Sequence, residues 1–433
     1  MKITRREFAK ATTTGALLPW LPVQPVGLSA ATPSLPDYGW IVEEQRIILR
    51  HRDLGQPEQS AVYPHGLTFA KNGDLLMAAS CAGAGKTFIM RSRDRGKTWT
   101  QQSVLEHKVE GEYTSGLVES MSRTRSGRLV ASYCSLKQEQ ELTKPGWPYY
   151  VPQGNNYRFS HVSSNQWGVY SDDEGITWRY VPMDISPFKS FDPEASTQIF
   201  EEQDGTLVTS FRGHLTQEEL DAGISSVGVI RSRDAGLSWG DANPIVRGQP
   251  GSGLWYNESQ LLPLPDGRWL CMVRLNNNNF KDSPLTMCRS YSHDRGHTWT
   301  YPVRTQFRGG EPGLGFLPDG AVVAVQTNLR TWMDDLTRPE VQSGLLYEVS
   351  YNSGLTWSYW GPLYLSEPGS REHRGSPIVR SLDAETAIAV YHRGEKEGNQ
   401  KIPGDKYGPQ FIGASWLRKV AAADPRASKL RYR

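Results

Sequence analysis

Ionisable and polar side chains recur at two equivalent positions of a repeated unit, and their types suit proton transfer and anion binding. One set lies at or near the start of an alternating apolar run: His65, Glu119, Glu194, Glu258, Glu311 and His373. The other set lies seven residues after a turn position: Ser80, Cys134, Arg212, Arg274, Thr327 and Tyr391. Such groups rarely lie in a protein core without partners. Their recurrence therefore indicates a functional site, with structural ion pairs between repeats as the alternative.

These residue types suit acid and base catalysis, and two carboxylates could share the work of a glycosidase. Glycosidases commonly use two carboxylates beside the scissile bond, and histidine can move protons near neutral pH. The sequence predicts Glu258, His65 and His373 as catalytic residues, with Arg274 and Arg212 holding a substrate carboxylate by paired hydrogen bonds. The other predicted substrate-binding residues are Glu194, Glu311, Arg330, His392, Tyr256 and Trp147.

A turn followed by an apolar strand positions these residues, and the pair occurs six times. The turns are Asn72-Gly73, Ser126-Gly127, Asp204-Gly205, Asp266-Gly267, Asp319-Gly320 and the degenerate Asp383-Ala384. Dipeptide turns between alternating apolar runs are typical of antiparallel hairpins. The repeat therefore predicts six similar antiparallel sheets.

An eight-residue phrase, Ser-x-Asp-x-Gly-x-Thr-Trp, follows in phase with five of the six units. Its copies occupy 92–99, 171–178, 232–239, 292–299 and 350–357, with Ser238 and Asn352 as the only departures. We expect the Asp to accept hydrogen bonds from turn amides, the Gly to take a positive φ and the Thr hydroxyl to bind the exit backbone. The Trp supplies apolar surface for burial between neighbouring sheets.

This phrase resembles the Asp-box of the sialidase superfamily, whose members are six-bladed β-propellers with structural boxes away from the active site. The resemblance implies an all-β propeller over residues 38–420, followed by a short basic tail at 421–433. The sixth unit lacks an outer strand. We therefore expect residues 40–50 to pair with 411–417, which closes the ring and removes an exposed sheet edge.

The segment from Asn257 to Arg274 resembles the family's fourth-blade segment, which places Glu258 and Arg274 on an active-site glutamate and one arginine of a carboxylate-binding triad. Arg330 is the candidate for the third arginine, with Arg338 in the same loop. Val62-Tyr63-Pro64-His65 replaces the family's first-blade Phe-Arg-Ile-Pro. The family's aspartic acid is absent from residues 80–87, and its tyrosine nucleophile from residues 373–377.

The resemblance implies an exo-acting glycoside hydrolase for a terminal acidic sugar of the sialic or uronic acid type. A histidine-dependent glycan lyase and a non-catalytic carbohydrate-binding propeller are the alternatives. An insertion at about 136–165 contains Trp147 and forms either a wall of the sugar site or a packed cover.

Composition and the N-terminus point to export. The 433 residues carry 48 basic and 46 acidic side chains, a balance that favours neither a nucleic-acid nor a polyanion partner. Residues 1–31, with Arg5-Arg6 before an apolar run, resemble a twin-arginine signal and predict a periplasmic or secreted protein. The run is too short for stable membrane insertion. No zinc-like cysteine spacing occurs, so we expect no metal or cofactor and four buried free thiols.

Overall fold

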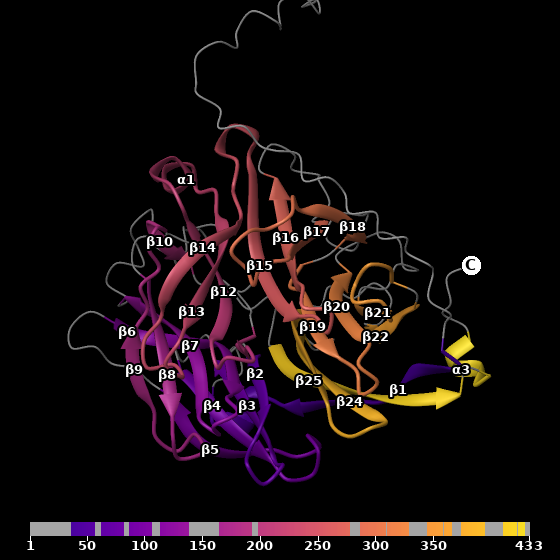
Figure 1. Ribbon diagram of the computed structural model, residues 1–433. Helices are drawn as coiled ribbons and strands as arrows, with labels where there is room; N and C mark the ends of the chain where they lie inside the picture. Colours follow the sequence, from indigo (N-terminus) through magenta and orange to yellow (C-terminus); the bar gives the residue numbers. More distant parts are fainter. Residues whose placement is uncertain are drawn as a thin grey trace, which may run out of the picture. The chain divides into compact units, whose positions relative to one another are not determined.

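The computed structural model describes the greater part of the chain downstream of residue 35. The described ranges are 36–56, 62–81, 86–105, 113–137, 164–192, 198–277, 286–308, 310–328, 344–357, 359–365, 374–394, 410–421 and 423–428. They form six antiparallel sheets, five of four strands and one of five (Figure 1). The predicted all-β, six-bladed propeller is confirmed.

The blades follow one another along the chain, and each runs from an inner strand to an outer strand. Blade 1 contains β2 (Val62–Phe69), β3 (Leu75–Cys81), β4 (Lys86–Ser92) and β5 (Thr100–Leu105). Blade 2 contains β6 (Tyr113–Arg123), β7 (Leu129–Lys137), β8 (Ser164–Ser171) and β9 (Arg179–Pro182). Blade 3 contains β10 (Ser190–Asp192), β11 (Phe200–Glu201), β12 (Leu207–His214), β13 (Ser226–Ser232) and β14 (Gly240–Val246). Its inner edge is therefore divided, because β10 and β11 both pair with β12.

The remaining three blades repeat the same order. Blade 4 contains β15 (Leu254–Pro263), β16 (Trp269–Asn277), β17 (Thr286–Ser292) and β18 (Val303–Arg308). Blade 5 contains β19 (Gly313–Phe316), β20 (Val322–Asn328), β21 (Gly344–Ser350) and β22 (Tyr359–Leu365). Blade 6 contains β23 (Arg374–Ser381), β24 (Thr386–Gly394), β25 (Gln410–Ala421) and β1 (Tyr38–Leu49). Helical segments are short: η1 (His51–Leu54), α1 (Gln217–Ala222), η4 (Pro250–Ser252) and α3 (Pro425–Ser428).

The N-terminal strand closes the ring as predicted. In Figure 1 the indigo β1 lies beside the yellow β25, with Trp40 opposite Lys419 and Leu49 opposite Ile412. Every backbone group that this pairing satisfies would otherwise lie on an open sheet edge. Blade 6 thus combines both ends of the described chain, so its stability depends on residues far apart in sequence.

The boxes form turns held by a serine and a carboxylate. In the first box the Ser92 hydroxyl donates to Asp94 Oδ1 and accepts from the Gly96 amide, both at 2.8 Å. Asp94 also accepts from the Thr98 amide at 2.8 Å and from the Thr98 hydroxyl at 2.6 Å. The threonine hydroxyl therefore binds the carboxylate and not the exit backbone. The turn has positive φ at both Arg95 (63°) and Gly96 (88°).

Apolar residues pack between adjacent blades in six clusters, one at each blade interface. Box tryptophans contact five of these clusters: Trp99, Trp178, Trp239, Trp299 and Trp357. The sixth cluster, between blades 5 and 6, contains Trp40 from β1, which is fully buried. Trp40 therefore supplies the indole that the absent sixth box would have provided.

The centre of the ring is crossed by polar side chains. Gln260 accepts from the Leu314 amide at 2.6 Å, and its own amide donates to the Pro377 carbonyl at 3.4 Å. Gln198 donates to Gln260 at 3.2 Å and accepts from Arg380 at 3.3 Å. These hydrogen bonds link blades 3, 4, 5 and 6 to one another.

All four cysteines are free and buried, as predicted. Burial raises the pKa of Cys271, and it raises that of Cys288 to about 11, so both thiols stay protonated at neutral pH. Among the described residues, no helix is long and apolar enough to cross a bilayer.

Candidate functional site

The described members of the two predicted sets of residues lie at the same end of the blades. In blade 4, Leu254 at the start of β15 lies opposite Asn277 at the end of β16. In blade 1, Val62 lies opposite Cys81 in the same way. Starts of inner strands and ends of second strands therefore share one edge of each sheet, and we call this edge of the ring the mouth.

Glu258 and Arg274 form an ion pair at the mouth. A register shift in β15 between Tyr256 and Ser259 places Glu258 in a bulge, where a strand can redirect a side chain. Arg274 Nε lies 2.8 Å from Glu258 Oε2, as a close ion pair without the alignment of a hydrogen bond. The side chains of Arg274 and Glu258 are 17% and 6% exposed.

Nε is the nitrogen of Arg274 that lies closest to the Glu258 carboxylate. A guanidinium group carries its N–H donors in a planar fork, a geometry that suits the two oxygens of a carboxylate. The sequence predicted both residues for the site but not their pairing.

Arg212 lies at the corresponding end of β12 in blade 3 and is 3% exposed. The inner strand of blade 4 is fixed against β12 by a 2.9 Å hydrogen bond from Ser259 to Ser210. Arg212 therefore lies on a strand that is fixed directly to the strand carrying Glu258.

A second group at the mouth comprises Tyr63, His65 and His392. The ring of Tyr63 stacks on His65 with centroids 5.7 Å apart, and it meets His392 edge-on at 4.7 Å. His65 Nδ1 lies 2.6 Å from the Val118 carbonyl. Because a carbonyl only accepts, Nδ1 donates, and neutral His65 keeps its lone pair on Nε2. Burial lowers the pKa of His65 to about 4, so the ring is neutral at pH 7.

Glu311 joins this second group from blade 5. Its Oε2 accepts from the Ser376 amide at 2.5 Å and from the Ser376 hydroxyl at 3.2 Å. His392 Nδ1 lies 3.9 Å from the same oxygen, and His392 is fully buried. Blades 1, 5 and 6 therefore contribute ionisable groups to one cluster.

Tyr256 lies away from this polar cluster. It is 3% exposed and packs in the apolar cluster between blades 3 and 4, where burial raises its pKa. Four predicted site residues lie outside the described residues: His373, Glu194, Arg330 and Trp147.

Tyr63 and Ser376 contact predicted residues of the mouth but were not themselves predicted. Tyr63 lies in the first-blade segment that departs from the family pattern, and that departure was the available signal. Ser376 carried no signal, because its contact with Glu311 depends on how blades 5 and 6 pack. Local sequence does not encode such a contact.

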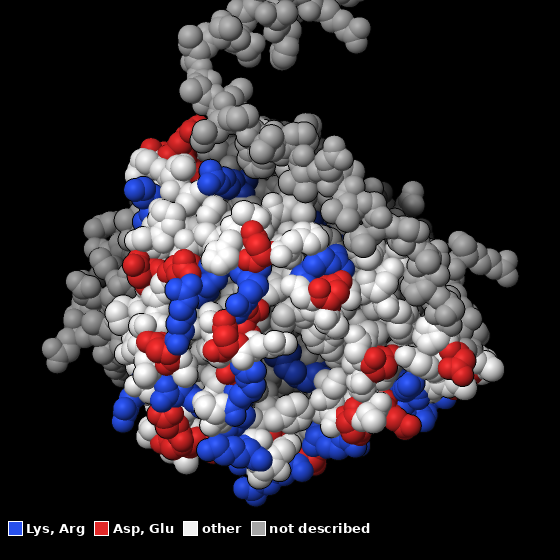
Figure 2. Space-filling view, in the orientation of Figure 1, with Lys and Arg blue, Asp and Glu red and all other residues white. Residues whose placement is uncertain are grey.

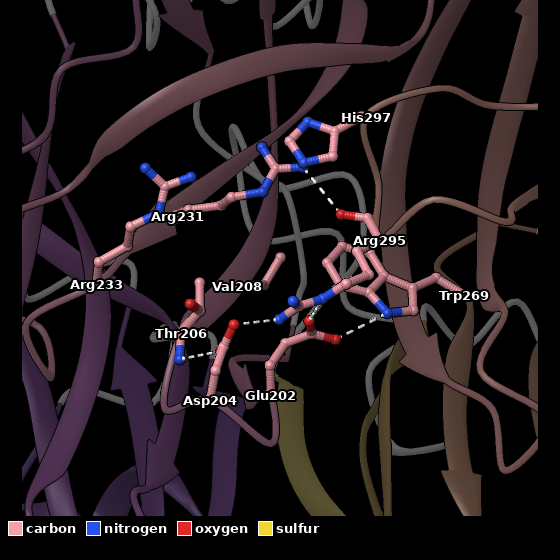
Figure 3. A pocket seen from close by; sticks show the side chains of 9 residues that line it. All are labelled: Glu202, Asp204, Thr206, Val208, Arg231, Arg233, Trp269, Arg295 and His297. Atoms are coloured by element: carbon pink, nitrogen blue, oxygen red, sulfur yellow. Dashed lines mark hydrogen bonds and ion pairs between the residues drawn. The ribbon is translucent and has the colours of Figure 1, made fainter.

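A cavity of about 80 Å³ lies at the opposite, box-bearing end of blades 3 and 4 (Figure 3). Its lining includes Arg295, whose Nη2 lies 2.6 Å from Asp204 Oδ2, and which also pairs with Glu202. Glu202 accepts from the Trp269 indole at 3.0 Å. These contacts join the turn of blade 3 to the box of blade 4, so the cavity has a structural explanation.

Charged side chains are mixed on the face shown in Figure 2, where basic and acidic residues alternate without a continuous field of one sign. This face therefore presents no extended cationic surface.

A family model described as a BNR repeat-like domain matches residues 44–272. Among solved structures, a protein of unknown function from Dyadobacter fermentans is 17% identical, with a TM-score of 0.64 over 88% of this chain and 99% of that one. A Hadza microbial sialidase is 16% identical, with a TM-score of 0.55 over 83% of this chain and 66% of that one. An alpha-L-arabinanase from Penicillium chrysogenum is 15% identical, with a TM-score of 0.54 over 88% of this chain and 98% of that one. None of the curated proteins compared with the sequence matches it. At these identities the structural likeness establishes the fold alone.

Proposed function

The chain belongs to the BNR repeat-like domain family and forms a sialidase-superfamily propeller, and from this premise we propose that it is an exo-acting glycoside hydrolase for a terminal acidic sugar. The main support for the proposal is the close ion pair between Glu258 and Arg274 at the mouth. A carboxylate and a guanidinium group lie there on adjacent strands.

Arg274 has the geometry to orient an acidic sugar. Its terminal nitrogens would take the substrate carboxylate while Nε keeps Glu258 in place. Glu258 would then lie beside the bound sugar, as expected of a carboxylate that acts at the scissile bond. Because Glu258 is almost fully buried, water would compete weakly for its charge once the sugar covers it.

A screen of purified protein tests this proposal. Sialosides and uronic-acid glycosides are compared with neutral glycosides, and release of a free terminal sugar is measured. The proposal expects hydrolysis of at least one acidic class and slower hydrolysis of its neutral analogue. Binding of acidic glycans without any turnover would instead support a carbohydrate-binding propeller.

His65 supports a second candidate, a histidine-dependent glycan lyase. A neutral imidazole with its lone pair on Nε2 is suited to remove a proton from the carbon beside a carboxylate. A lyase would leave an unsaturated sugar that absorbs ultraviolet light, whereas a hydrolase would not. Mass spectrometry of the products decides between them, because hydrolysis adds one water and elimination adds none.

We also propose export by the twin-arginine pathway, on the evidence of Arg5 and Arg6 before the apolar run. Fractionation of cells expressing the full chain would test it, with Arg5→Lys together with Arg6→Lys as the variant. Export of the wild type but not of the double variant is expected. Equal export of both would contradict the proposal.

A further inference from the structure

One arginine side chain reaches across the centre of the ring. Arg380 lies near the end of β23, the inner strand of blade 6, and its Nη1 donates to Gln198 Oε1 at 3.3 Å. Gln198 lies two residues before β11 in blade 3, which is three blades away from blade 6 in either direction. The guanidinium group of Arg380 therefore lies in the central channel, the space that the inner strands enclose.

Arg380 has no acidic partner among the described residues. Burial lowers its pKa to about 10, and no nearby charge contributes to this change. The side chain is therefore cationic at neutral pH. Its Nη1 donates to the Gln198 side chain and, at 2.8 Å, to the Val379 carbonyl, and both acceptors are neutral. A cation that is removed from water without a counter-charge is costly, and buried charges in proteins are generally paired.

This lack of a counter-charge distinguishes Arg380 from other arginines that the blades largely bury. Those arginines have carboxylate partners: Arg123 pairs with Glu174, Arg274 with Glu258 and Arg289 with Glu348. Each of these cations is neutralised by another residue of the chain. The charge of Arg380 is left to be neutralised by a group that enters the channel from solution.

The channel leaves space beside this guanidinium group. Arg380 is only half-buried by its accessible surface, although the surrounding protein lowers its pKa. Its Nε and Nη2 donate no hydrogen bond to a described residue. A second bond across the channel, from the Gln260 amide to the Pro377 carbonyl of blade 6 at 3.4 Å, keeps the space narrow. The site therefore suits a small occupant that carries negative charge.

We propose that the central channel binds a small inorganic anion, of about the size of chloride, beside Arg380. The Nε and Nη2 edge of a guanidinium group presents parallel N–H donors, which can both donate to one anion. The anion would neutralise Arg380 and so complete the polar bridge between blades 6 and 3. Arg380 lies towards the box-bearing end of β23, whereas the mouth lies at the start of the inner strands. The anion site is thus separate from the proposed sugar site.

Stability measurements at constant ionic strength test this proposal. Chloride replaces gluconate, an anion too large for the channel, and unfolding by denaturant is measured. A ligand that binds only the folded state stabilises it, so the free energy of unfolding of the wild type should rise with chloride. At saturation the rise is about 1.4 kcal/mol for each tenfold increase in chloride. Arg380→Gln should abolish this dependence, whereas Arg233→Gln, which removes an exposed arginine, should keep it. Equal chloride dependence in the wild type and Arg380→Gln would overturn the proposal.

Crystals of the wild-type protein grown in bromide provide a second test, which does not depend on the folding of Arg380→Gln. Anomalous scattering should locate one bromide at hydrogen-bonding distance from Nε and Nη2 of Arg380. Water alone at that position, or a carboxylate side chain in contact with Arg380, would overturn the proposal. Bromide in the crystal without any chloride dependence of wild-type stability would indicate an adventitious ion only, and would overturn it as well.

Discussion

The indole nitrogen of Trp40 donates a hydrogen bond to Asp319 Oδ2 at 3.3 Å and so joins the last outer strand to the turn of blade 5. The Trp40 carbonyl accepts from the Tyr347 hydroxyl at 3.1 Å. One residue of β1 therefore bonds to two elements of the neighbouring blade. The N-terminal strand closes blade 6 and also fastens it to blade 5.

Replacing Trp40 should destabilise the whole ring. Trp40→Ala leaves a large cavity at the interface of blades 5 and 6, and we expect it to lower the free energy of unfolding by about 3–5 kcal/mol. Trp40→Phe keeps most of the apolar surface and should cost less. Denaturant unfolding measures both, and equal stability of the alanine variant and the wild type would contradict the closure role.

The boxes should support stability without contributing to turnover. Asp234→Ala removes the acceptor for the Ser238 amide and hydroxyl, at a cost of about 1–3 kcal/mol in unfolding free energy. Asp234→Asn should be milder, because Asn352 already accepts from the Thr356 amide at 2.8 Å and donates to its hydroxyl at 2.9 Å. An Asp234→Ala protein with an unchanged melting temperature and lost activity would refute this structural role.

The box carboxylates should also make the free energy of unfolding depend on pH. Burial alone would raise the pKa of Asp173, but hydrogen bonds from Thr177 and Ser171 lower it to about 2. An unfolded Asp has a pKa of about 3.9, so the unfolded state binds the proton first as the pH falls. The stabilisation is therefore complete above that value and is lost as pH falls from about 4 through about 2. The free energy of unfolding should decrease as the pH falls through this range, and it should decrease less steeply in Asp173→Asn. Identical pH dependence in the two proteins would contradict the lowered pKa of Asp173.

The periodic parts of the fold were predictable because each box and turn satisfies its own hydrogen bonds locally. The closing pair β1 and β25 followed from a missing outer strand and an unassigned apolar run. The substitute role of Trp40 did not follow, because it depends on packing against Asp319 in another blade. The sequence likewise placed Glu258 and Arg274 near each other, but the ion pair depends on a bulge in β15.

Placement of the other site residues was less predictable for a similar reason. Successive side chains of a strand point to opposite faces of the sheet, so an error of one position in the alignment moves a side chain to the other face. Spacing alone therefore could not assign Tyr256 either to the mouth or to the apolar cluster between blades 3 and 4. The Glu311–Ser376 contact joins two blades through strained backbone, which no local pattern encodes.

Arg274 should determine the preference for acidic sugars. Arg274→Gln keeps a polar side chain but loses the charge, and we expect KM for an acidic glycoside to rise about 100-fold. The neutral analogue should be affected much less. Arg233→Gln, an exposed arginine at the box end, is the matched control and should leave both values unchanged. Equal effects of Arg274→Gln on acidic and neutral substrates would place Arg274 in a structural role only.

We propose that the sugar reacts at the mouth beside Glu258, and the rate of hydrolysis by the Glu258→Gln variant tests this claim. The substitution preserves shape while deleting the charge that faces Arg274. With the melting temperature unchanged, kcat/KM for the acidic glycoside should fall at least about 100-fold, or roughly 3 kcal/mol of transition-state stabilisation. A folded Glu258→Gln protein with near-normal kcat/KM would contradict the claim and move the chemistry to His65 or His373.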